Sequence, residues 1–272
     1  MRAIMFPASW RACAWIVLLA GTTLASSTLA APPASVFLED LTSPELTQRI
    51  VAGATTILVP IGGTEQNGAH MTLGKHNVRA RLLAERIARE LGNAIVAPVI
   101  AYVPEGALAP PTGHMRYPGT ITVPADAYRK ILESAARSFK AAGFRDIVFL
   151  GDHGDYQKDD RAVAAALDRE WAGTPVRAHA LDAYYRAASA GFADTLRKQG
   201  YPPNEIGTHA GLADTSLMLA IDPAQVRAER LSGRPAPGVS GDPARASAAL
   251  GHPAVEAIVA QSVAAIRTAT TR

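Results

Sequence analysis

Short apolar runs alternate along this chain with segments whose apolar residues recur at helical spacing. The runs cover residues 56–61, 94–102, 147–150 and 176–181, and the helical patterns cover 77–91, 126–142, 160–171, 214–221 and 253–268. Buried strands of parallel sheets are typically continuous apolar runs connected by helices. The alternation therefore predicts an α/β fold, a three-layer α/β/α sandwich around a mainly parallel sheet. In such folds ligands bind beyond the carboxyl ends of the strands, so the loops after Ile61 and Leu150 are the places to search for a site.

The N-terminus has the pattern of a secretory signal peptide. Arg2 and Arg11 precede an apolar stretch over residues 13–20, and small residues follow up to Ala30. This predicts a leader over residues 1–30, cleaved near Ala30, and a single exported domain over 31–272 in the periplasm or outside the cell. A membrane anchor is the alternative, but the apolar run is shorter than the roughly 20 residues that a spanning helix needs.

Several classes of protein are disfavoured by what the sequence lacks. The only cysteine, Cys13, lies in the predicted leader, so the mature chain would have no thiol nucleophile, thiolate metal site or disulfide. The net charge is +3 with no basic run, which gives no indication of nucleic-acid binding. No later stretch predicts a membrane span, and neither a Gly-x-Ser-x-Gly nor a Gly-x-Gly-x-x-Gly motif follows a predicted strand.

Carboxylate and imidazole side chains follow two of the predicted strands. They are Glu65, His70 and His76 after the first strand, and Asp152, His153 and Asp155 after the third. These groups suit Zn²⁺, Mn²⁺ or Fe²⁺. In one loop alone they would be ordinary turn-capping residues, but two such loops at equivalent positions of the sheet favour a shared metal site.

Four segments in order resemble the creatininase (creatinine amidohydrolase) family. They are the Val-Pro-Ile-Gly-Gly-Thr-Glu-Gln run at 59–66 with Gly68 and His70, Tyr-Pro-Gly-Thr-Ile at 117–121, His-Gly at 153–154, and His-Ala-Gly at 209–211 with Thr-Ser-Leu-Met at 215–218. The resemblance implies a three-layer α/β fold, a homo-oligomer that is often a hexamer, and a divalent metal centre. It also implies cleavage of a C–N amide bond in a small cyclic amide or formamide.

By position, the resemblance implies metal ligands at Glu65, Asn67, His76, His153 and Asp155. Two of them depart from the family pattern, because Asn67 replaces a histidine and His76 replaces an aspartate that bridges two metals. A neutral imidazole has one free lone pair and cannot bridge as a carboxylate does. We therefore expect one ion per chain, with zinc favoured and manganese or iron as alternatives.

The resemblance also implies roles for the remaining candidates. The ion would activate a water molecule, and His209 would pass a proton to the leaving nitrogen. If Asp155 holds no ion of its own, it becomes free to act as general base on that water. Without the resemblance, His209 would be interpreted as a surface loop histidine. Lys75 could help to position an anionic substrate, but we interpret it as an exposed loop lysine. The pocket candidates are His114, Tyr117 and Asp214, and the candidates for supporting the ligands are His70, Asp152 and Tyr156.

Two rival functions stay open at this point. One is an exported protein that binds a small molecule without catalysis, because the changes at Asn67 and His76 could mark a lost activity. The other is a hydrolase of lactones or other esters, for which the metal chemistry would be the same.

Overall fold

The computed structural model describes residues 35–232 and 236–271. The predicted leader, with its cleavage point and Cys13, lies outside the described residues, so the expectation of export stays a prediction. The described part begins just before a short 3-10 turn, Leu38–Asp40, and helix α1, Ser43–Val51. The sequence pattern did not reveal α1, although Thr42 and Glu45 form a capping box at its start.

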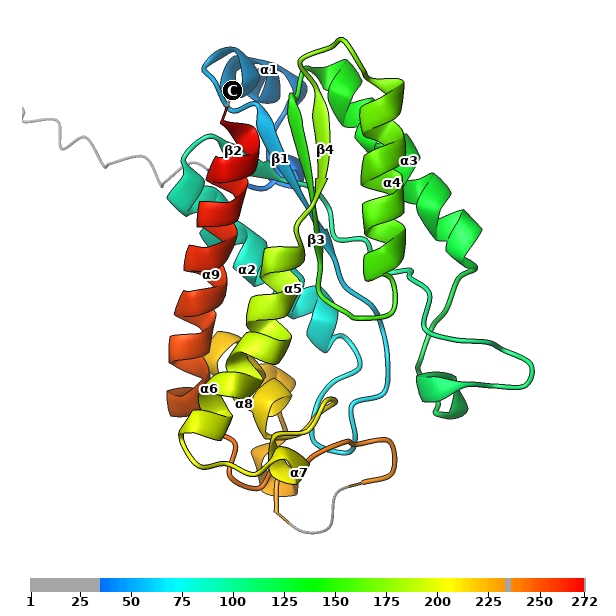
Figure 1. Ribbon diagram of the computed structural model, residues 1–272, viewed down its shortest axis with the longest axis vertical. Helices are drawn as coiled ribbons and strands as arrows, with labels where there is room; N and C mark the ends of the chain where they lie inside the picture. The colour runs from blue at the N-terminus through cyan, green and yellow to red at the C-terminus, as the bar shows by residue number, and fades with distance from the viewer. Residues whose placement is uncertain (1–34, 233–235, 272) are drawn as a thin grey trace, which may run out of the picture. The chain divides into compact units, whose positions relative to one another are not determined.

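A parallel four-stranded sheet lies at the centre, in the order β2-β1-β3-β4 (Figure 1). The strands are β1, Thr56–Ile61; β2, Ala94–Val96; β3, Asp146–Gly151; and β4, Arg177–Ala180. The last residues of β1 and β3, Ile61 and Gly151, are paired in register. The two loops that carry carboxylate and imidazole side chains therefore leave the sheet side by side, as the search for a site assumed.

Helices cover both faces of the sheet, which confirms the predicted three-layer fold (Figure 1). Alternate residues of β1 separate the two cores, with Leu58 facing one and Ile57 facing the other. Helices α3, Ala125–Ala142, and α4, Gln157–Glu170, cover the Ile57 face. The Leu58 face is covered by α2, Lys75–Leu91; α5, Asp182–Arg186; α6, Phe192–Lys198; α8, Leu212–Ile221; and α9, Ala248–Thr270, and α7, Pro203–Ile206, contributes to the same core.

Two helix boundaries differ from the prediction in ways that matter. Helix α2 begins two residues before Asn77, and the Asn77 side chain instead accepts a hydrogen bond from the N–H of Gly63 at 3.0 Å. Helix α9 begins at Ala248, because the Ser247 side chain caps it. By length and composition α9 could cross a bilayer, but its buried side chains pack here against α8 and α2.

Candidate metal centre

Tyr156 fastens the two strand-exit loops to each other. Its fully buried hydroxyl donates to the carbonyl oxygen of Gly62 at 2.6 Å and accepts the backbone N–H groups of Asp152 and His153 at 3.1 and 3.0 Å. The candidate ligand His153 is thereby held at a fixed place relative to the loop that carries Glu65. Tyr156 thus supports the candidate ligand His153 by binding the backbone N–H of His153.

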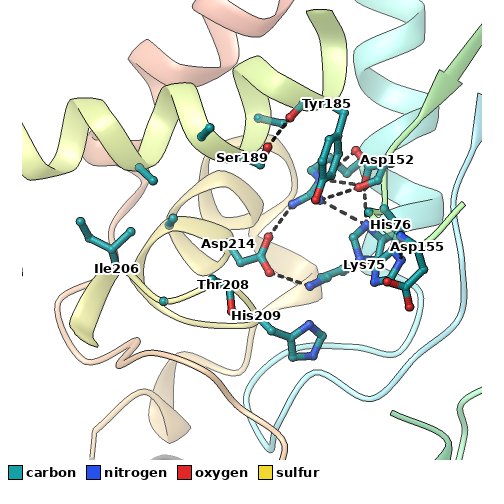
Figure 2. Close-up of a pocket in the computed structure, with 18 of the residues that line it drawn as sticks. Lys75, His76, Asp152, Asp155, Tyr185, Ser189, Ile206, Thr208, His209 and Asp214 are labelled. Atoms are coloured by element: carbon teal, nitrogen blue, oxygen red, sulfur yellow. Dashed lines mark hydrogen bonds and ion pairs between the residues drawn. The ribbon is translucent and has the colours of Figure 1, made fainter. Parts of the chain in front are cut away.

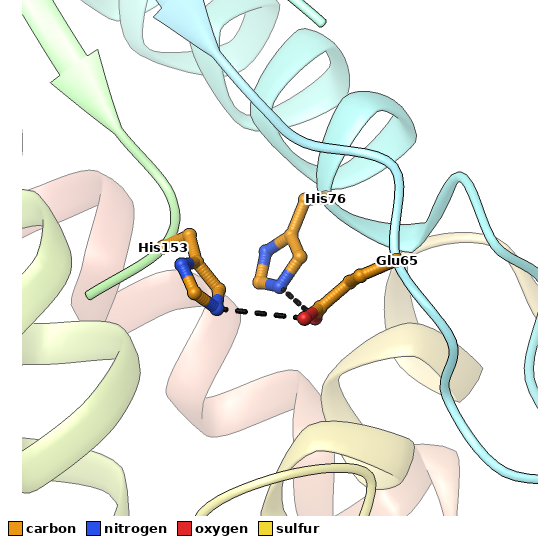
Figure 3. Close-up of side chains that lie close together, drawn as sticks. All are labelled: Glu65, His76 and His153. Carbon is orange, nitrogen blue, oxygen red and sulfur yellow. Dashed lines mark hydrogen bonds and ion pairs between the residues drawn. The ribbon is translucent and has the colours of Figure 1, made fainter. Parts of the chain in front are cut away.

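Glu65, His76 and His153 converge on one point from these two loops and the first turn of α2 (Figure 3). Their ligand atoms all lie within 4.8 Å of one another. The Nε2 atom of His76 is 2.8 Å from Oε1 of Glu65, and Nε2 of His153 is 3.5 Å from Oε2. Two of the three side chains are buried and His153 is nearly so, which makes this a shielded group of two imidazoles and one carboxylate.

The donor set fits a divalent cation. Oε2 of Glu65 is buried and accepts no hydrogen bond from the described residues. Two ligands of a tetrahedral zinc ion, each about 2.1 Å from the metal, lie about 3.4 Å apart. The 3.5 Å between Oε2 of Glu65 and Nε2 of His153 matches that spacing. Burial alone would raise the pKa of Glu65, but Lys75 and the two imidazoles hold it far below its usual value, so the carboxylate is ionised.

Asp152 orients His76 for this role. Its Oδ2 lies 2.6 Å from Nδ1 of His76, and it also accepts hydrogen bonds from Arg79 at 2.9 Å and from the Tyr184 hydroxyl at 2.7 Å. Burial opposes ionisation of Asp152, but Arg79, His76 and Tyr184 together keep its pKa below the usual range. An ionised Asp152 accepts a hydrogen bond from Nδ1–H, so Nε2 is the nitrogen of His76 that would bind a metal.

Lys75 is fully buried, so its interpretation as an exposed loop lysine was wrong. Because α2 begins at Lys75, this side chain lies in the site, with Nζ 2.7 Å from Asp214 and 3.5 Å from Glu65 (Figure 2). Asp214 also accepts hydrogen bonds from Arg79 and from the N–H of Ala210, both at 2.9 Å. Burial would raise the pKa of Asp214, but Lys75 and Arg79 hold it well below its usual value. Both carboxylate oxygens of this predicted pocket residue are therefore engaged in ion pairs.

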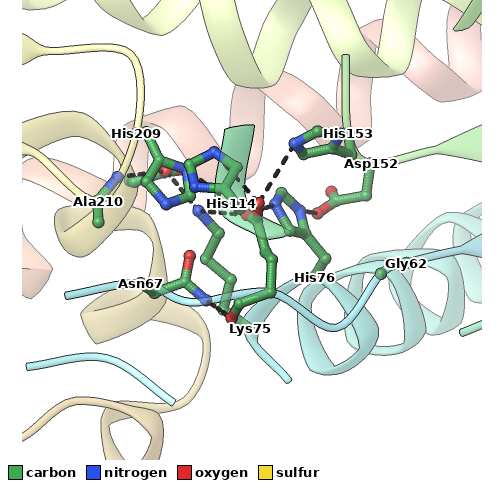
Figure 4. Close-up of polar contacts among 12 residues, drawn as sticks. Gly62, Asn67, Lys75, His76, His114, Asp152, His153, His209 and Ala210 are labelled. Carbon is green, nitrogen blue, oxygen red and sulfur yellow. Dashed lines mark hydrogen bonds and ion pairs between the residues drawn. The ribbon is translucent and has the colours of Figure 1, made fainter. Parts of the chain in front are cut away.

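His209 and His114 also bring ligand atoms close to Glu65. Figure 4 shows their two imidazoles side by side. The two imidazoles stack 3.9 Å apart, and His209 is 8% exposed, which excludes the surface-histidine interpretation. Nε2 of His209 donates to the carbonyl oxygen of Gln66 at 2.8 Å, and its Nδ1 is 3.5 Å from Oε1 of Glu65. Burial, with a further contribution from Lys75, lowers the pKa of His209 to about 3, so its ring is neutral.

The other predicted site residues are placed less centrally. The Asn67 amide donates to the carbonyl oxygens of Glu65 and Thr72 at 2.9 and 3.0 Å, and its own Oδ1 is buried without a partner among the described residues. His70 forms a hydrogen bond to the Thr215 hydroxyl at 3.1 Å and none to a candidate ligand within the described ranges. Tyr117 directly follows the 3-10 turn Gly113–Arg116 and does not line the cavity.

A cavity of about 540 Å³ opens over the metal candidates (Figure 2). His76 and His153 reach it from one side, and the exposed Asp155 stands at its edge. The opposite wall is mostly apolar and comes from the α5–α8 region, with Ala188, Ala193, Pro203, Ile206 and Ala213. The cavity has the size of a small-molecule site, with a charged floor and an apolar side.

Sequence reasoning missed Glu105, which comes from a third loop, after β2. Glu105 is 1% exposed, and its Oε2 lies 3.8 Å from Nε2 of His153. The predicted metal ligands came only from the segments after Ile61 and Leu150. Glu105 follows the apolar run 94–102 much as Glu65 follows 56–61, and that similarity was the signal available.

This chain is similar to several known hydrolases. The family described as creatininase, creatinine amidohydrolase, matches residues 39–266. The mycofactocin precursor peptide peptidase of Mycobacterium tuberculosis is 31% identical over 233 residues, which are 75% of this chain and 81% of that protein. The creatinine amidohydrolase of Pseudomonas putida is 26% identical over 208 residues, covering 74% of this chain and 77% of the relative.

Solved structures agree with these relationships. A crystal structure of creatinine amidohydrolase superimposes with a TM-score of 0.74 at 25% identity, covering 88% of this chain and all of that one. Other solved creatininases include a zinc–zinc form and a manganese form. A metal-dependent amide hydrolase is therefore the general activity that these relatives support, and the residues around Glu65 suit such a metal. The chain belongs to the creatininase family.

Proposed function

We propose that this chain is an exported hydrolase that cleaves a C–N amide bond of a small molecule, a cyclic amide or a formamide. A divalent ion would be held by Glu65, His76 and His153. The observation that carries the proposal is the convergence of these three ligand atoms within 4.8 Å, with Oε2 of Glu65 buried and lacking a hydrogen-bond partner among the described residues. Two imidazoles and one carboxylate form a ligand set used by catalytic zinc.

Zinc is our first choice for the ion, with manganese and iron as alternatives, and we infer one ion per chain. The Nε2 atom of His76 faces Glu65, because Nδ1 is engaged by Asp152, and one imidazole nitrogen can bind only one ion. The Lys75 ammonium already lies between Glu65 and Asp214, where it supplies positive charge to both carboxylates. When bound, the ion would polarise the substrate carbonyl and lower the pKa of a bound water.

The chain's own residues would move the protons. Asp155 stands at the cavity edge beside His153, where its exposed carboxylate can accept a proton from water. His209 is neutral and has its one proton on Nε2, bound to the Gln66 carbonyl oxygen. It would therefore have to accept a proton at Nδ1 before passing one to the leaving nitrogen. Arg79 and Tyr184 would hold Asp152, and through it His76, in place.

A short peptide is a second candidate substrate. It is favoured by the 31% identity to the mycofactocin precursor peptide peptidase, which covers 81% of that protein. The cavity of about 540 Å³ is lined in part by the exposed Asp155 and has room for the end of a peptide chain. A lactone or other ester would use the same metal chemistry, so only substrate trials separate these classes.

The decisive test combines metal analysis with a substrate panel. Protein purified without chelator or affinity nickel should contain close to one Zn, Mn or Fe per chain, and His76→Ala should lose it. Turnover of one class among cyclic amides, N-formyl compounds, short peptides and lactones should disappear on chelation and return with one metal. The matched control is Glu85→Gln, on the exposed side of α2, where Glu85 pairs with Arg89. Saturable binding without turnover would favour the binding protein, and no metal uptake at all would refute the proposal.

We also propose that the chain forms a homo-oligomer, with a hexamer as the state that the family resemblance implies. No partner chain is needed to bring Glu65, His76 and His153 together. Light scattering coupled to size exclusion measures the mass directly, and a monomer at assay concentrations would contradict this part of the proposal.

A further inference from the structure

Glu105 is a buried carboxylate that the proposed zinc ligands leave unused. It is 1% exposed, and neither of its oxygens has a hydrogen-bond partner among the described residues. Its backbone is well anchored, because its N–H donates to the Thr122 hydroxyl at 3.0 Å. Burying an unpartnered carboxylate is unfavourable unless a proton or a cation compensates it. Burial raises the pKa of Glu105 to about 8, so a proton can compensate it in the metal-free chain, and a cation within reach of its oxygens could take the place of that proton.

The side chain of Glu105 reaches the metal candidates along the backbone of Gly63. This glycine has a φ of +148°, and a Cβ there would lie 2.5 Å from Oε1 of Glu105. Beyond Gly63, Oε2 of Glu105 lies 3.8 Å from Nε2 of His153, the one ion-pair partner that it has in the described part of the chain. Ligand atoms of Glu105, His153 and Asp155 all lie within 4.8 Å of one another.

We propose that Glu105 is a metal ligand, and that it forms with His153 and Asp155 a second cation position. This inference rests on the metal centre proposed above. The second position shares His153 with the first position, formed by Glu65, His76 and His153. Since one imidazole nitrogen binds one ion, the two positions are alternatives, and each chain holds a single ion in one of them.

The two positions differ in chemistry and in access. Two carboxylates and one imidazole form a harder donor set than two imidazoles and one carboxylate, so the second position suits Mn²⁺ better than the first one does. Asp155 is exposed and lies at the cavity edge, whereas Glu65 is fully buried. The second position thus has one solvent-exposed ligand, whereas the first position has none.

Ion binding to the metal-free chain tests the inference. Mn²⁺ binding is followed by the loss of the free-ion EPR signal, and Zn²⁺ binding by competition with a chromophoric chelator. Glu105→Gln should weaken Mn²⁺ binding by about tenfold or more and Zn²⁺ binding by less than about threefold, and Glu65→Gln should show the opposite preference. Glu85→Gln, on the exposed side of α2, is the matched control and should bind both ions as the unaltered chain does.

Folding is checked by the melting temperature of each metal-free variant. Glu105→Gln replaces a buried carboxyl group, whose pKa burial raises to about 8, with a neutral amide of nearly the same size, so its metal-free form should melt no lower than the unaltered chain. Unchanged Mn²⁺ affinity in Glu105→Gln would overturn the inference while leaving the first metal position intact. Two Mn²⁺ ions per chain would overturn the sharing of His153. Failure of the unaltered chain to bind either ion would instead refute the metal centre as a whole.

Discussion

Replacing Asp152 with asparagine removes the charge that orients His76 and keeps the size of the side chain. In the protein, Oδ2 of Asp152 lies 2.6 Å from Nδ1 of His76 and 2.9 Å from Nε of Arg79. Loss of such an outer hydrogen-bonding partner costs roughly 10- to 100-fold in metal affinity. That range corresponds to about 1.4–2.7 kcal/mol of binding free energy. We expect Asp152→Asn to weaken Zn²⁺ binding by this amount.

The same substitution should also lower the stability of the fold. Arg79 loses its anionic partner at position 152 but retains Asp214 at 2.9 Å, so its guanidinium is not left unpaired. Breaking a buried ion pair costs about 3–5 kcal/mol, and the retained partner favours the lower end of that range. Urea unfolding of the metal-free protein measures this cost separately from metal binding.

Tyr184→Phe is the matched control for Asp152→Asn. It deletes the 2.7 Å hydrogen bond from the Tyr184 hydroxyl to Oδ1 of Asp152 and leaves the carboxylate charge in place. A single buried hydrogen bond is worth about 1 kcal/mol, so Zn²⁺ affinity should change by less than about fivefold. Chelator competition measures both variants under conditions in which each is folded. If Asp152→Asn bound Zn²⁺ as tightly as the unaltered chain, the proposed path from Asp152 through His76 to the ion would be refuted.

Three further predictions test other parts of the chain. Lys75→Met should tighten Zn²⁺ binding, because it removes a buried positive charge beside the site, and weaker Zn²⁺ binding would contradict this. The same substitution deprives Asp214 of its closest cation, so it should destabilise the metal-free fold by about 3 kcal/mol. Burial raises the pKa of Asp160, which accepts a 2.5 Å hydrogen bond from Tyr128, to about 7. Folding therefore favours the protonated acid, and unfolding free energy should fall by up to about 4 kcal/mol as pH rises from 4 to 8, a slope that Asp160→Asn should flatten in urea titrations at several pH values. The intact mass of the protein recovered after export should correspond to a chain that begins just after Ala30. The mass of the uncleaved chain would contradict the predicted signal peptide.

The fold was predictable because its signal is repeated along the chain. Each apolar run contains a strand, although the run at 94–102 yields only Ala94–Val96. Beyond Val96 that run leaves the sheet, apart from a single bridge between Ile61 and Ile100. Helix α1 and the short helices between 182 and 206 were missed, because they are too brief to establish a helical period.

The centre of the site could be predicted because residues at the ends of adjacent parallel strands must lie close together. Glu65 and His153 follow strands whose ends are paired in register, so their contact is a consequence of the topology. The buried state of Lys75 was not predictable, because it depends on where α2 begins. Glu105 was missed because its loop bends back along Gly63, a path set by long-range contacts.

The balance of charge around Glu65 links these findings to the number of ions. The carboxylates near the site are Glu65, Glu105, Asp152, Asp155 and Asp214, and the lysine and arginine side chains paired with them in the described ranges are Lys75 and Arg79. Arg79 forms ion pairs with Asp152 and Asp214. Lys75 forms ion pairs with Asp214 and with one oxygen of Glu65. On the side of the site facing His153, the carboxylate oxygens have no lysine or arginine partner in the described ranges, and only the imidazole of His153 lies near them. One divalent ion would add positive charge there, whereas a second ion would meet the ammonium of Lys75, which supports our proposal of a single ion.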